Sequence, residues 1–130
     1  MQFIPNKKLR TMRLSIIRSR EINQYGLPEE IQVVATVWLI KVGILKAMLG
    51  EKDPNRYIVY VKSYRSGKGI AKLLLLKINE IFQELARKNK VIIRHVVHFL
   101  SDESEMKLTK YYRQLGYTKE GELLVKMFKP

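Results

Sequence analysis

Residues 57–88 read YIVYVKSYRSGKGIAKLLLLKINEIFQELARK, and this stretch decides the fold of the chain. Residues 57–61 are rich in β-branched and aromatic side chains, which predicts a strand. A glycine-bearing turn follows, and residues 69–88 then place apolar side chains three and four positions apart, which predicts a helix with one buried face. The residues of that face are Ala71, Leu74, Leu75, Ile78, Phe82 and Leu85.

The turn between these two elements has the features of an anion site. Gly67 and Gly69 allow the backbone to approach a ligand closely, and the first N–H groups of a helix have no partner within it. Lys68 and Lys72 add positive charge at the same end. We therefore expect a phosphate-bearing ligand at residues 66–72, with a structural turn that binds no ligand as the alternative.

Composition and charge limit the other possibilities. A chain of 130 residues with 46% hydrophobic residues predicts a single folded domain over residues 1–130. The absence of cysteine excludes disulfides and thiolate chemistry. With 25 Lys and Arg against 12 Asp and Glu, the net charge of +13 favours an anionic partner, such as a phosphorylated cofactor, nucleic acid, an acidic protein or a membrane surface. A solvated basic surface explains the same charge equally well.

No targeting or membrane-spanning segment is expected. The N-terminus lacks the continuous apolar core of a signal peptide, and the longest apolar zone, residues 33–49, is interrupted by Lys41 and Lys46. The basic residues form no block of the kind that binds nucleic acid, so nucleic acid is the less favoured partner. We expect a cytoplasmic protein without a membrane partner.

The remaining segments predict an α/β fold. Residues 31–49 have helix-like signals at both ends, but their β-branched residues favour two strands with a tight connection at residues 41–43. The other predicted elements are a strand at 12–19, a turn at 20–30, a buried strand at 91–100, a helix at 102–115 and a closing hairpin at 117–128. The succession of strand, helix and strand predicts two parallel neighbours. The expected fold is a mixed, twisted central sheet of about six or seven strands, with helix 69–88 on one face and helix 102–115 on the other.

Two common phosphate-binding motifs do not match the glycine turn. A P-loop requires Ser or Thr after its lysine, whereas Lys68 is followed by Gly69. A dinucleotide-binding fold requires GxGxxG, and Lys72 stands at the position of the third glycine.

Residues 61–75, VKSYRSGKGIAKLLL, resemble the acetyl-CoA-binding motif of the GNAT superfamily of N-acetyltransferases, in which a strand is followed by Arg/Gln-x-x-Gly-x-Gly/Ala and a helix. Gly69 and Ala71 match the last two signature positions, whereas Ser66 stands where the family has Arg or Gln. The resemblance implies acetyl-CoA as cofactor, with its pyrophosphate on the helix amides and a backbone N–H near Val61 facing the developing oxyanion. The implied cofactor-binding residues are Val61, Ser66, Gly67, Lys68, Gly69, Ile70, Ala71 and Lys72.

A second segment, residues 110–117 with the sequence KYYRQLGY, is similar to the family's Y-x-x-x-G-F/Y segment. The resemblance implies that Tyr112 is the general acid that protonates the leaving thiolate. A core tyrosine on an apolar helix face is the alternative interpretation. Glu105 stands where the family often has Asn, and the resemblance covers about residues 56–128.

Other parts of a transferase site are less complete. The family usually has two helices after the first strand, and residues 20–30 leave no room for them. Acceptor recognition is therefore reduced, borrowed from a partner subunit or built from residues 31–49. Residues 57–61 contain no carboxylate to act as general base. His95 and His98 are three apart in a strand and face opposite sides, so each would act alone, and a hydrogen-bonded structural histidine is the favoured interpretation.

The expected function is transfer of an acetyl group from acetyl-CoA to an amine, by direct attack in a ternary complex. The acceptor amine would belong to a protein N-terminus, a lysine or a small molecule, and the lack of a strong base favours a less basic amine. A homodimer is compatible with this expectation. The alternatives are a catalytically inactive GNAT-fold module that binds CoA and a basic module that binds nucleic acid.

Overall fold

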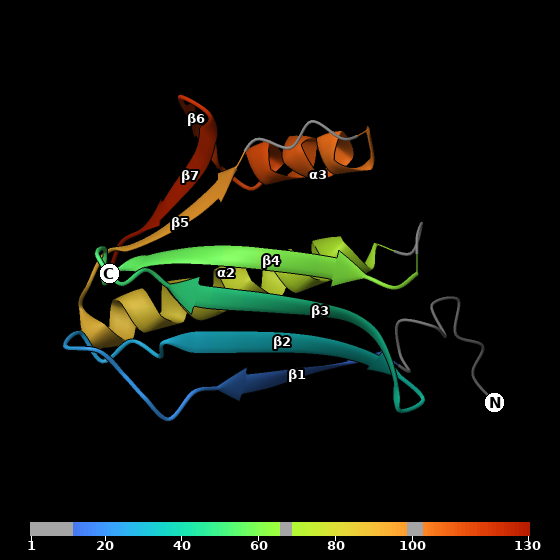
Figure 1. Cartoon of the computed structure of the whole chain (residues 1–130), viewed down its shortest axis with the longest axis horizontal. Coiled ribbons are helices and arrows are strands. Elements are labelled where there is room, and N and C mark those ends of the chain that lie inside the picture. Colours follow the sequence, from blue (N-terminus) through green and yellow to red (C-terminus); the bar gives the residue numbers. More distant parts are fainter. Residues whose placement is uncertain (1–11, 66–68, 99–102) are drawn as a thin grey trace.

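The computed structural model describes residues 12–65, 69–98 and 103–130, which form one sheet and two helices (Figure 1). The elements are β1 (Met12–Arg18), β2 (Glu30–Val37), β3 (Ile40–Leu49), β4 (Arg56–Ser63), α2 (Ile70–Asn89), β5 (Ile93–His98), α3 (Glu103–Gln114), β6 (Thr118–Glu120) and β7 (Leu123–Phe128). No helix in this described part of the chain has the length and apolar character needed to cross a bilayer.

The seven strands have the order β1-β2-β3-β4-β5-β7-β6. Only β4 and β5 are parallel, and α2 connects them, while every other neighbouring pair is antiparallel. The structure therefore confirms the mixed sheet and the strand–helix–strand unit that residues 57–88 predict. The closing hairpin is also confirmed, and Gly121 forms its turn with a φ of 63°.

Residues 31–49 form two strands, as predicted, but the connection lies at Trp38 and Leu39 and not at residues 41–43. Both turn residues have positive φ, 50° and 69°, in a two-residue hairpin that usually takes Asn-Gly. Gly43 is needed for packing and not for the turn, because a Cβ at this position would lie 2.6 Å from Cγ2 of Ile70. The glycine permits close packing of β3 on the start of α2, so it was misleading as a turn signal.

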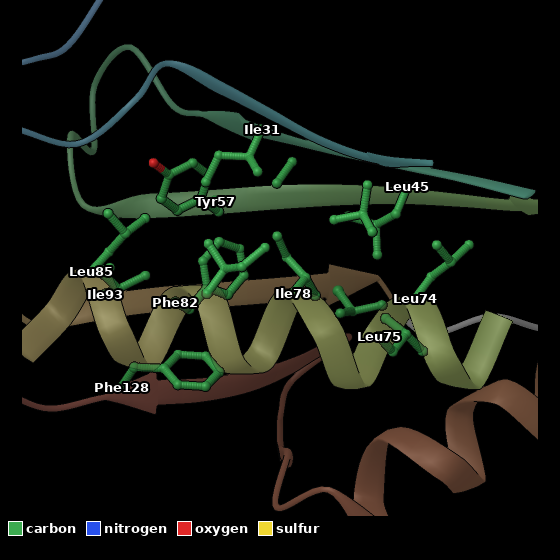
Figure 2. Packing of buried hydrophobic residues seen from close by; sticks show 14 of the residues in the cluster. Ile31, Leu45, Tyr57, Leu74, Leu75, Ile78, Phe82, Leu85, Ile93 and Phe128 are labelled. Atoms are coloured by element: carbon green, nitrogen blue, oxygen red, sulfur yellow. The ribbon is translucent and has the colours of Figure 1, made fainter. Parts of the chain in front are cut away.

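Helix α2 supplies most of the core. Its apolar face lies on the sheet, where the ring of Phe82 stacks on that of Tyr57 at 4.8 Å between centroids. Figure 2 shows this face of α2 packed against side chains of the sheet, among them Ile31 of β2, Leu45 of β3, Tyr57 of β4, Ile93 of β5 and Phe128 of β7. The buried residues of α2 are Ile70, Leu74, Leu75, Ile78, Ile81, Phe82, Leu85 and Ala86, which matches the predicted stripe except at Ala71, which is half-buried.

The two helices lie on the same face of the sheet, which corrects the expectation of one helix on each face. His95 of β5 directs its side chain to one face, and its ring contacts both Phe82 of α2, at 5.5 Å, and Tyr112 of α3, at 6.0 Å. Because strand side chains alternate between faces, both helices are on the side of His95. Helical periodicity identifies the apolar side of a helix, but it does not say which face of the sheet that side covers.

Candidate functional site

Strands β4 and β5 begin as neighbours and then diverge, as Figure 1 shows. The register of β4 with β5 includes only Arg56, Tyr57 and Ile58, whereas its register with β3 continues to Ser63. From Val59 onward, the edge of β4 on the β5 side therefore has no strand partner among the described residues.

The main-chain groups of Val61 point into this opening. On the other edge, the carbonyl of Arg56 accepts a hydrogen bond from the N–H of Gly50 at 2.9 Å, and the N–H of Tyr64 donates to the carbonyl of Val42 at 2.9 Å. The even-numbered residues of β4 thus direct their main-chain groups to β3, and the odd-numbered residues direct theirs away from it. Val61 therefore presents an N–H and a C=O where β5 has diverged, and its side chain is half-buried on the α2 face.

The N-terminus of α2 follows directly on the end of β4. Gly69 precedes the helix in the left-handed conformation, with a φ of 68°, and the helix start has no side-chain cap and no acidic residue in its first turn. A Cβ at Gly69 would meet no heavy atom of the described residues within 4 Å, so these residues leave space beside it. The amides of the first turn therefore have no partner within the helix, as an anion site requires. Ser66, Gly67 and Lys68 lie outside the described residues.

Helix α3 approaches this end of α2. The ammonium group of Lys72 lies 5.1 Å from the ring centroid of Tyr111, which brings α3 to the first turn of α2. Of the other predicted cofactor-binding residues, Ile70 is buried and Ala71 is half-buried. The structure thus brings the start of α2 close to the tyrosines of α3.

Tyr112, the predicted general acid, is 2% exposed. Its ring contacts those of His95, at 6.0 Å, and Tyr117, at 5.0 Å. No hydrogen bond within the described part of the chain reaches its hydroxyl group. Burial raises the pKa of Tyr112 well above its usual value, so the phenol keeps its proton at neutral pH.

Behind Tyr112 lies a group of four hydrogen-bonded side chains, His95, Tyr117, Asn79 and Lys126, which we call the polar cluster. Nδ1 of His95 is hydrogen-bonded to the hydroxyl of Tyr117, which also accepts a bond from Nδ2 of Asn79 at 3.0 Å. Nζ of Lys126 donates to Oδ1 of Asn79 at 3.0 Å and to the carbonyl of Leu115 at 2.6 Å. The cluster therefore joins α2, β5, β7 and the segment after α3.

The polar cluster defines the state of His95. Nδ1 of His95 is satisfied by the Tyr117 hydroxyl, whereas Nε2 is buried and has no hydrogen-bond partner among the described residues. Burial, and to a lesser degree the charge of Lys126, lowers the pKa of His95 to about 3. A neutral imidazole of such low basicity is a poor acceptor for an amine proton. These features favour the interpretation of His95 as a hydrogen-bonded structural residue and not as a general base.

Sequence reasoning did not find Asn79 or Lys126, and it placed Tyr117 in the Y-x-x-x-G-F/Y segment without giving it a role. One signal was available, because Asn79 is a polar residue beside the apolar stripe of α2, between Ile78 and Phe82. Lys126 has no local signature, since it and its partner Asn79 are 47 positions apart.

Comparison with known proteins gives a structural match only. No protein-family model matches the chain, and no curated protein matches its sequence. Among solved structures, a GNAT-family acetyltransferase from Streptococcus pneumoniae is similar with a TM-score of 0.58 and 15% identity, over 77% of this chain and 67% of that one.

Two further structures agree. A GNAT-family acetyltransferase from Brucella melitensis, solved in complex with acetyl-CoA, has a TM-score of 0.55 and 19% identity over 77% of this chain and 59% of that one. An acyl-CoA N-acyltransferase from Pseudomonas aeruginosa has a TM-score of 0.57 and 9% identity over 89% of this chain and 97% of that one. The resemblance seen in the two sequence segments is confirmed for the architecture, and the chain has the fold of the GNAT acetyltransferases.

Proposed function

We propose that this protein is an acyl-CoA-dependent acyltransferase that transfers an acetyl group to an amine. The observation that carries the proposal is the divergence of β4 from β5 beside the uncapped start of α2. Together they offer a strand edge for an extended chain and unpaired amides for a diphosphate, which are the two parts that a coenzyme A molecule requires.

The residues present fit acetyl-CoA at both of its ends. The amides of Ile70, Ala71 and Lys72, with the ammonium group of Lys72, would hold the pyrophosphate. The open edge of β4 would pair with the pantetheine amides, and the N–H of Val61 would donate to the thioester oxygen as it gains charge. When bound, the cofactor supplies an activated thioester carbonyl. In the sequence-based expectation Ser66, Gly67, Lys68 and Gly69 complete the cradle.

Tyr112 is the proposed general acid. In the reaction the amine nitrogen forms a bond to the carbonyl carbon, the carbon–sulfur bond breaks, and the Tyr112 hydroxyl delivers a proton to the sulfur. Its raised pKa keeps that proton on the phenol until the thiolate leaves. His95 is neutral and hydrogen-bonded, so we assign the amine proton to water, and a weakly basic amine is the favoured acceptor among protein N-termini, lysines and small amines.

Isothermal titration with acetyl-CoA tests the binding part of the proposal. We expect saturable binding, weakened several-fold in Lys72→Gln because one cation is lost near the pyrophosphate. Lys88→Gln is the matched control, since this exposed lysine lies at the other end of α2. Absence of binding at millimolar acetyl-CoA would overturn the proposal.

Replacing Tyr112 with Phe tests the chemistry. We expect kcat, measured as CoA release with a panel of amines, to fall by about 100-fold or more, while acetyl-CoA affinity and thermal stability stay nearly unchanged. Tyr111→Phe, the neighbouring half-buried residue, is the control and should retain activity. Unchanged turnover in Tyr112→Phe would remove the general-acid role, and binding without turnover for any amine would favour an inactive CoA-binding module.

A further inference from the structure

The turn between β2 and β3 presents three large apolar side chains to solvent. Trp38 is 73% exposed, Leu39 is 98% exposed and Ile40 is 58% exposed. We call these three consecutive residues the hairpin tip. They project from the end of a two-stranded hairpin and contribute almost nothing to the packing of the described residues, so the fold alone gives no reason for them.

The backbone makes the choice of residues more unusual. Trp38 and Leu39 both have left-handed φ values, which favour Asn and Gly over bulky side chains. A turn selected only to join two strands would place small polar residues here. The hairpin tip therefore combines unfavourable turn chemistry with full exposure of apolar surface.

Positive charge surrounds the hairpin tip. Arg13, Thr36 and Lys41 are register partners on β1, β2 and β3, directly behind the turn, and both cations are exposed. Lys62 lies two rows further from the turn, opposite Ile44. Along β1 to β4 there are six basic residues and one acidic residue, Glu30, which pairs with Met48 far from the tip.

We propose that the hairpin tip inserts into the surface of an anionic lipid bilayer. The indole of Trp38 and the side chains of Leu39 and Ile40 enter the interface, where Trp is favoured, and Arg13 and Lys41 contact the headgroups. The proposal does not depend on the acyltransferase function. It replaces the sequence-based expectation of no membrane partner, because that expectation considered only segments that span a bilayer.

A bilayer fits the tip better than a protein partner does. A stable protein interface buries about 800 Å² on each partner, over a complementary surface. Three side chains at the end of one hairpin offer a small, convex surface. Insertion into a bilayer requires no complementary shape, and a short apolar anchor joined to basic residues gives reversible binding to anionic lipid.

Trp38 is the only tryptophan of the chain, so its fluorescence reports on the tip directly. With vesicles of phosphatidylcholine and phosphatidylserine we expect a blue shift of emission, quenching by lipids brominated in the acyl chain, and co-sedimentation that weakens as salt is added. With phosphatidylcholine alone we expect binding about tenfold weaker or less, because the charge contribution is lost. No blue shift on anionic vesicles, or equal binding to both vesicles, would overturn the proposal.

The double variant Trp38→Asn/Leu39→Gly separates insertion from folding. It introduces the pair that the turn favours, so the protein should be at least as stable as the parent, yet co-sedimentation with anionic vesicles should fall by about tenfold or more. Met127→Ser is the matched control, because this side chain is 50% exposed at the opposite end of the sheet, and its loss should leave binding unchanged. Full binding by the double variant would overturn the proposal.

Charge reversal tests the second half of the inference. Arg13→Glu/Lys41→Glu should abolish the preference for anionic vesicles, whereas Lys52→Glu/Lys90→Glu, at exposed positions far from the tip, should retain it. Sedimentation velocity without lipid addresses the competing occupant, a second copy of this chain. A dimer that forms with increasing concentration and disappears in Trp38→Asn/Leu39→Gly would overturn the membrane proposal in favour of self-association.

Discussion

The polar cluster and the hairpin tip both reverse the usual distribution of residues, but in opposite senses. The first buries a histidine completely and a lysine partly, and the second exposes a tryptophan and a leucine. In the polar cluster four hydrogen bonds within the chain compensate most of the reversal, while Nε2 of His95 has no partner among the described residues. At the hairpin tip no described residue compensates it.

This difference separates structure from interaction. A buried polar group that has its hydrogen bonds is part of the core, and its removal should lower stability. An exposed apolar side chain that lacks contacts contributes little to the stability of the fold. Its removal should therefore leave the free energy of unfolding unchanged or raise it. Three measurements of stability test whether the two regions differ in this way.

The largest effect is expected in the polar cluster. Tyr117→Phe removes the hydroxyl that bonds His95 and Asn79 and leaves two polar groups without this partner. We expect the free energy of unfolding to fall by about 2 to 3 kcal/mol, measured by urea titration. Tyr64→Phe, at an exposed position, should change it by less than about 0.5 kcal/mol. Equal effects in the two variants would show that the cluster is not a structural unit.

The loss of stability at low pH should be smaller than the effect of Tyr117→Phe, and it should arise from one residue, His95. The pKa of His95 is lowered from 6.5 to about 3 in the folded state, so the unfolded chain binds a proton in this interval and the folded chain does not. Stability is fully present above pH 6.5 and should fall by up to about 1.4 kcal/mol for each pH unit below it.

His95→Gln isolates this contribution, because glutamine does not titrate. Urea unfolding of both proteins at about pH 7.5 and about pH 5 should give a steeper loss for the parent than for the variant. Parallel pH profiles would contradict the assignment of a neutral, buried His95.

The smallest effect is expected at the hairpin tip, and its sign is opposite. Trp38→Asn/Leu39→Gly should raise the free energy of unfolding by about 1 kcal/mol, because the left-handed backbone is then occupied by residues that favour it. Trp38→Ala/Leu39→Ala removes the same apolar surface without that preference and should give no gain. A loss of stability in the Asn-Gly variant would show that the tip contributes to packing.

Much of the architecture could be read from local patterns. The strand at residues 57–61, the helix after it and the hairpin at 117–128 follow from β-branched and aromatic runs, apolar spacing and glycine positions. The turn in residues 31–49 was misplaced because Gly43 resembles a turn glycine, although it serves packing against Ile70. The site was predicted only in part, since Gly69 and Tyr112 belong to recognisable segments whereas Lys126 does not.

The sequence by itself determined the succession of elements, the apolar stripe of α2 and the excess of positive charge, because each of these depends on residues close together in the chain. Only the tertiary structure decided that α3 lies on the same face as α2, that β4 leaves β5 after three paired residues, and that His95 is neutral. Each of these depends on contacts between segments far apart in the chain, where burial and hydrogen bonding act on groups that no local pattern connects.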